Sequence, residues 1–219
     1  MRAALLPAQG STLQAHWLRL CESLAIRGPG PVQMGQRLEQ AWRRWPRRYH
    51  DTRHLQACVE AAQQWQAHMV DPAAVAWALW FHDAVYWPWR RDNEARSAEL
   101  ARNAALGLGL APAFAQRVHH LVMLTAHGHA PAARDPDGDW LVDIDLGVLG
   151  QPRPVYERYA RDVRREYFWV LPGRWRKGRG AVLRHFLGQP SIYRTPAFRE
   201  RFEGAARANL QHELASLAR

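Results

Sequence analysis

The sequence contains little cysteine, no apolar stretch of membrane-spanning length and no signal-peptide core. Its two cysteines, Cys21 and Cys58, lie in apolar helical contexts and form no CxxC pair. This excludes a zinc ribbon and argues against a disulfide-stabilised scaffold. The segment 1–9 has one arginine and only a brief apolar patch, unlike a secretion signal. We therefore expect a reduced, cytoplasmic protein with no membrane partner.

Strand-like alternation, internal repeats and low-complexity tracts are also missing. Apolar residues instead recur with helical spacing, and proline or glycine marks the ends of the periodic segments. At 219 residues the chain is expected to form a single domain. The sequence predicts an all-α fold with helices over about 12–26, 32–45, 49–68, 73–81, 92–106, 112–126, 155–170, 177–187 and 196–217.

The chain is strongly basic, with 30 Lys and Arg against 20 Asp and Glu, a net charge of +10 and a pI near 10.7. This sign of charge favours anionic partners such as phosphorylated small molecules, nucleic acid or anionic membranes, or it serves solubility alone. The arginines are scattered and form no long basic tail, which argues against nucleic acid as a partner. A local cluster at Arg43, Arg44, Arg47 and Arg48 is predicted to be a solvated face, with phosphate contact as the alternative.

The segment 79–86 places an imidazole and a carboxylate, His82 and Asp83, at the end of an uncharged apolar run. Asp71 and Pro72 before the run are typical of an N-cap and a first helical residue. The run is too short to cross a bilayer and predicts a buried helix. An ionised Asp83 at its end is costly unless the carboxylate is paired or bound to a metal.

Other histidines and aspartates occur in similar apolar settings. His54 shares a helical stripe with Cys58, and His50 lies four residues before it. His127 follows a helix and is a candidate for ligand or substrate contact. A second apolar run contains Asp143 and Asp145, and N-capping can explain one of these two carboxylates but hardly both.

Together, His54, His82, Asp83 and either Asp143 or Asp145 form a mixed nitrogen and oxygen ligand set. Such a set suits a divalent ion such as Mn²⁺, Fe²⁺, Co²⁺, Ni²⁺, Zn²⁺ or Mg²⁺. A metal with four protein ligands keeps room for water and a substrate oxygen, and it lowers the pKa of that water.

The order His54, His82-Asp83, Asp145 resembles the HD-domain superfamily of metal-dependent phosphohydrolases, named for its His-Asp doublet. The segments RYHDTRH, WFHDAVY, DNEARSAELA, DIDLGVLG, REY and SIYRTPAFRE together resemble one bacterial branch of predicted HD phosphohydrolases. The resemblance implies a helical bundle with a central metal, in a core of about 49–150 with a helical extension over 151–219. It also implies Asp145 as the last ligand, because a leucine follows it, with Asp143 as second choice. The chain lacks the HDxGK pattern of the cyclic-di-GMP phosphodiesterases.

The function implied is hydrolysis of a small phosphorylated metabolite, with a nucleotide as the expected substrate. Asp83, His50 and His127 are the expected catalytic residues, with the two histidines assisting as proton shuttles or donors. Nothing in the pattern excludes a homodimer. The cations expected to orient the phosphate are Arg164, Arg165, Arg174, Lys177 and Arg179.

Three other functions fit parts of the pattern. A non-catalytic metal- or nucleotide-binding sensor would bind its ligand without turnover. A basic helical nucleic-acid-binding protein would show salt-dependent binding that survives metal removal. A metal-dependent oxygenase would consume oxygen.

Overall fold

The computed structural model describes residues 12–126 and 134–218, and these residues form helices and no strand. This confirms the all-α prediction. The α-helices are α1 (Thr12–Ser23), α2 (Gly30–Trp42), α3 (Thr52–Trp65), α4 (Pro72–Phe81), α5 (Asn93–Gly107), α6 (Pro112–Met123), α7 (Pro136–Asp145), α8 (Arg153–Glu166), α9 (Pro172–Gly188) and α10 (Pro196–Leu217). Two 3₁₀ helices, η1 (Gln66–His68) and η2 (Leu146–Gly150), follow α3 and α7 directly.

Local capping explains where several of these helices begin. The side chains of Asp51, Asp71, Asp135 and Thr195 each accept a backbone N–H from the first turn of α3, α4, α7 and α10. Each cap satisfies a donor that the helix itself cannot pair, a gain of about 1 kcal/mol. The predicted starts at Asp71-Pro72 and Thr195-Pro196 are therefore confirmed. Asp92 stands at the N-cap of α5 but makes no capping bond, because its carboxylate pairs with Arg90 and Arg96.

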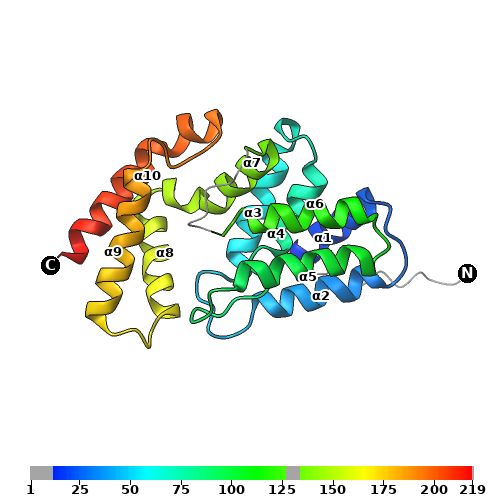
Figure 1. The fold of residues 1–219 in the computed structure, drawn as a ribbon, viewed down its shortest axis with the longest axis horizontal. Coiled ribbons are helices and arrows are strands. Elements are labelled where there is room, and N and C mark those ends of the chain that lie inside the picture. The colour runs from blue at the N-terminus through cyan, green and yellow to red at the C-terminus, as the bar shows by residue number, and fades with distance from the viewer. Residues whose placement is uncertain (1–11, 127–133, 219) are drawn as a thin grey trace, which may run out of the picture.

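Helix α4 lies at the centre of the first part of the molecule, among α1, α3, α5, α6 and α7 (Figure 1). It buries side chains on every face, as its uncharged sequence predicts. The ring of Trp17 from α1 lies 5.1 Å from Trp77 and 5.3 Å from Trp80. Burial of each such aromatic side chain contributes roughly 2–3 kcal/mol, so α4 is a fixed support for the residues at its C-terminal end.

Helices α8, α9 and α10 form the other side of the molecule, with α7 and η2 between them and the α4-centred helices (Figure 1). A buried arginine, Arg179 of α9, forms an ion pair with Glu213 of α10 at 2.7 Å, and Tyr156 of α8 bonds to the same glutamate. The two sides meet again where Glu166, at the end of α8, accepts N–H groups of the 48–50 segment. Within the described ranges, no helix combines the length and the apolar character needed to span a membrane.

Candidate metal centre

The His-Asp doublet lies at the C-terminal end of α4, where the sequence places it. Helix α4 ends at Phe81, and His82 follows as its buried C-cap residue. The His82 Nδ1 lies 2.8 Å from the carbonyl oxygen of Leu79. Because a carbonyl only accepts, Nδ1 carries the proton, and the Nε2 of the neutral ring presents its lone pair toward the candidate site.

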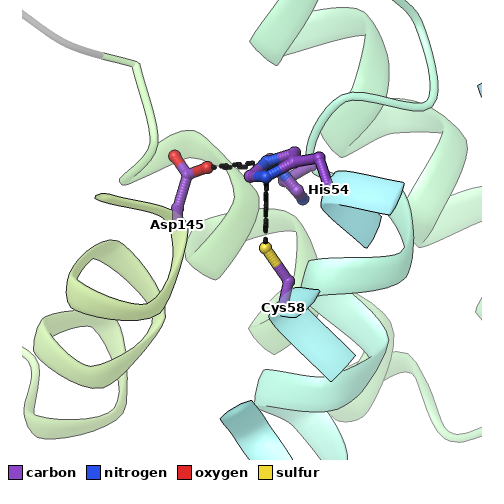
Figure 2. Close-up of side chains that lie close together, drawn as sticks. His54, Cys58 and Asp145 are labelled. Carbon is purple, nitrogen blue, oxygen red and sulfur yellow. Dashed lines mark hydrogen bonds and ion pairs between the residues drawn. The ribbon is translucent and has the colours of Figure 1, made fainter. Parts of the chain in front are cut away.

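Two other helices bring one ligand candidate each to His82. His54 comes from the first turn of α3, and Asp145 is the last residue of α7. The His54 Nε2 lies 3.2 Å from the His82 Nε2 and 3.1 Å from the Asp145 Oδ1, and the His82 Nε2 lies 3.4 Å from that oxygen. The Asp83 Oδ2 lies 3.5 Å from the His82 Nε2. Figure 2 shows Asp145 and Cys58 approaching the His54 ring from different directions.

These separations fit one cation. Bonds of about 2.1 Å from a metal to nitrogen or oxygen place neighbouring ligand atoms about 3.0 Å apart in an octahedron and about 3.4 Å apart in a tetrahedron. The three distances among the His54, His82 and Asp145 atoms run from 3.1 to 3.4 Å, and Asp83 joins the group through its 3.5 Å distance to His82. The atoms of His54, His82 and Asp145 therefore fit the divalent ion expected from the ligand set, with Asp83 beside them.

The electrostatics of the group also favour a cation. Burial lowers the pKa of His54, which keeps that ring neutral and able to act as a ligand. Burial also opposes charge on His82, but the carboxylates of Asp83 and Asp145 outweigh it and raise the His82 pKa to about 9. Burial alone would raise the pKa of Asp145, yet the two histidines hold it well below its usual value. The concentrated negative potential that retains a proton on His82 would equally favour a metal ion.

Cys58 is a candidate that the sequence reasoning missed. It lies one turn after His54 on α3, and its Sγ is 3.7 Å from the His54 Nδ1. One atom each from His54, Cys58, His82 and Asp145 all lie within 4.8 Å of one another. Burial, followed by the nearby Asp145, raises the pKa of this thiol well above its usual value. The shared stripe with His54 was the available signal, and a sulfur ligand would favour Zn²⁺ or Fe²⁺ over Mg²⁺.

His50 lies beside the centre rather than in it. Helix α3 begins after His50, with Asp51 as its N-cap, so His50 and His54 do not share a helix face. The His50 Nδ1 lies 2.7 Å from the Glu166 Oε2, and its Nε2 lies 4.0 Å from the Asp83 Oδ2. Burial opposes charge on His50, but the Glu166 carboxylate outweighs this effect and raises the His50 pKa.

Asp143, the second choice for the last ligand, faces a different part of the chain. It is fully buried, and its oxygens accept the backbone N–H groups of Arg194 and Thr195 and the Thr195 hydroxyl, each at 2.7 Å. Burial outweighs these bonds and raises the Asp143 pKa to about 6. The carboxylate therefore anchors the entry to α10, while Asp145 is the aspartate that meets the histidines.

A pocket of about 520 Å³ opens beside the centre, and its lining includes His54, Cys58 and Asp145. Its walls come from α3, η2, α8 and α10, so both sides of the molecule contribute. Three arginines line it: Arg53, Arg158 and Arg201. The pocket gives a small molecule access to the buried ligand group.

The cations expected to bind phosphate do not line this pocket. Arg164 donates to the carbonyl oxygens of Tyr167 and Val170, and Arg165 pairs with Asp162. Arg174 and Lys177 are exposed on α9. A phosphate role for these residues stays a prediction, and His127 lies outside the described residues.

Arg179 has a structural environment that its sequence context does not indicate. It is buried, pairs with Glu213, and its guanidinium donates to the Tyr159 hydroxyl at 3.2 Å. The Tyr159 ring packs 4.6 Å from the Tyr49 ring, which in turn lies 4.8 Å from His54. Arg179 therefore supports the aromatic wall next to His54.

Comparison with known proteins adds no relative: no protein-family model, curated protein or solved structure matches this chain.

Proposed function

We propose that this chain is a metal-dependent phosphohydrolase of the HD-domain type that acts on a small phosphorylated metabolite. The supporting observation is the convergence of His54, His82 and Asp145, from α3, the end of α4 and α7, at coordination distances in a buried group beside a pocket, with Asp83 3.5 Å from His82. The resemblance of the His-Asp doublet and its flanking segments to that superfamily supplies the reaction class and a nucleotide as the expected substrate.

The four side chains would hold a divalent ion, with Cys58 as a further candidate. A metal bound there supplies Lewis acidity, which lowers the pKa of water and polarises a phosphoryl oxygen. In the hydrolysis, the water oxygen bonds to phosphorus, the bond from phosphorus to the ester oxygen breaks, and a proton passes to the departing alcohol.

His50 is positioned to move that proton. Glu166 holds its Nδ1, and the Tyr86 ring stacks on the imidazole with centroids 4.4 Å apart. The Nε2 is left facing the side of the centre where Asp83 lies. A histidine oriented in this way by a buried carboxylate is suited to general acid–base work.

The test is phosphate release from a panel of nucleotides by protein stripped with a chelator and reloaded with Mn²⁺. We expect release that requires the metal and falls by at least about 100-fold in Asp145→Asn. Asp92→Asn, a change at the half-exposed N-cap residue of α5, is the matched control and should retain wild-type rates. Full activity in Asp145→Asn would remove the assignment, and tight nucleotide binding with no release would favour a sensor instead.

A further inference from the structure

Two of the three exposed arginines that line the pocket form no ion pair among the described residues. Arg158 reaches the pocket from α8 and Arg201 from α10. In the part of the chain that the structure describes, neither forms an ion pair with a carboxylate. The Arg201 guanidinium rests over the Phe202 ring at 5.1 Å, which orients the charge without neutralising it.

The third pocket arginine is neutralised by its neighbours. Arg53 lies 2.8 Å from Asp51 and 3.8 Å from Asp162, and it also donates to the Arg48 carbonyl oxygen. Those two aspartates line the same pocket, and Asp162 also pairs with Arg165 at 3.1 Å. Glu60 lines the pocket too, and its carboxylate accepts a hydrogen bond from Gln56. Arg158 and Arg201 are the lining arginines that form no ion pair among the described residues.

The pocket is elongated along α3. His54 and Trp65 both line it, and eleven helical residues separate them, which is roughly 16 Å at 1.5 Å per residue. The Trp65 ring lies 5.7 Å from the Phe198 ring of α10. The end of the pocket away from His54 is therefore lined by aromatic rings. Arg201 follows Phe198 by one turn of α10, and both residues line the pocket.

We infer that the pocket binds an elongated substrate with two negatively charged groups, one at the metal centre and a second at Arg158 and Arg201. A flat apolar body between the two charges would pack on the rings of Trp65, Phe198 and Phe202. This inference rests on the proposed function for the first of the two charges. Molecules with this chemistry include nucleosides with phosphates at two separate positions.

The test compares adenosine 5′-monophosphate with adenosine 3′,5′-bisphosphate, which differ by one phosphate. With Mn²⁺ present, we expect the bisphosphate to have a KM about tenfold lower, as a single charge-assisted contact allows. Arg158→Ala and Arg201→Ala should each raise the KM for the bisphosphate toward that for the monophosphate. Arg161→Ala and Arg199→Ala, exposed changes on the same helices outside the pocket lining, should retain the lower KM for the bisphosphate.

Equal KM values for the two nucleotides, together with no effect of either pocket variant, would overturn the inference. The proposed function fails separately, through the absence of turnover with any nucleotide. In that case calorimetry with the bisphosphate decides the subsite: binding by the wild type that weakens about tenfold in Arg158→Ala supports it, and unchanged binding refutes it.

Discussion

Glu166 is expected to stabilise the fold around the candidate centre more than any surface acid does. Its carboxylate is fully buried and accepts the N–H groups of Arg48, Tyr49 and His50, the His50 ring and the Tyr86 hydroxyl. Burial alone would raise the pKa of this carboxyl, but His50 and the hydrogen bonds lower it from 4.5 to about 2. At about 1.4 kcal/mol per pKa unit, the difference between these two pKa values corresponds to a stabilisation of the folded state by roughly 3 kcal/mol at neutral pH.

The pH dependence of this stabilisation follows from the direction of the Glu166 pKa shift. A carboxyl with a lowered pKa in the folded state stabilises fully above its unfolded pKa, here 4.5, and loses that stabilisation as the pH falls toward 2. Glu166→Gln should therefore unfold about 3 kcal/mol more easily than the wild type at pH 7. In the wild type, the titration of Glu166 should remove about 1 kcal/mol of its stabilisation between pH 6 and pH 4.

Urea unfolding at several pH values measures both quantities. Glu157→Gln is the matched control, because Glu157 is on the same helix, is half-exposed and, among the described residues, has a single ion-pair contact, at 4.0 Å with His212. Its effect should stay within about 0.5 kcal/mol. A Glu166→Gln protein as stable as the control at pH 7 would refute the reasoning.

Three further predictions concern the centre and the core. Saturating Mn²⁺, at about 100 times its Kd, should raise the Tm of the wild type by roughly 5–10 °C. Asp145→Ala should abolish that rise, and an undiminished rise would show that the ion binds elsewhere. Asp143→Ala should cost about 3–5 kcal/mol in urea unfolding, because it leaves buried donors ahead of α10 without an acceptor. It should still respond to Mn²⁺, and loss of that response would make Asp143 a ligand after all. Gly35→Ala should destabilise by about 1–3 kcal/mol, because its Cβ would stand 2.5 Å from the Trp17 Cδ1. Gly178→Ala meets no atom within 4 Å and should gain about 0.5–1 kcal/mol, and equal effects of the two glycine changes would contradict this account.

The sequence predicts well those features whose causes are local. The start of α4 at Asp71-Pro72 and the burial of its apolar run depend on neighbouring residues alone, and both are confirmed. The position of His82 and Asp83 at the end of that helix follows directly. Helix ends were predicted less closely: α1 ends at Ser23 and α6 at Met123, each three residues before the expected end.

Features that depend on contacts between distant residues could not be predicted from the sequence. Arg47 was assigned to a solvated cluster, which is wrong, because it is buried between the rings of Trp42 and Tyr86. Its guanidinium donates to the carbonyl oxygens of His50 and Asp83. These partners lie up to 36 positions away, and nothing within the four-arginine cluster distinguishes Arg47 from its neighbours.

The choice between Asp143 and Asp145 shows the same limit. Asp143 and Asp145 are two positions apart on a helix, so their side chains point about 200° apart. Only one of them can therefore face the histidines of α3 and α4. Periodicity alone does not identify which one, and the resemblance to HD domains gave the preference for Asp145. The distances from Asp145 to His54 and His82 support that preference.

The buried acids of this chain therefore have two different roles, and their partners distinguish them. Asp137, Asp143 and Glu166 each accept at least two backbone N–H groups from segments distant in the sequence. A cation could not replace such donors without leaving them unpaired, so these acids anchor loops. Asp145 instead faces the imidazole nitrogens of His54 and His82, which are donors only when protonated and ligands when neutral. A divalent ion in place of that proton would bind the carboxylate and both imidazoles, so Asp145 is the candidate ligand among these acids.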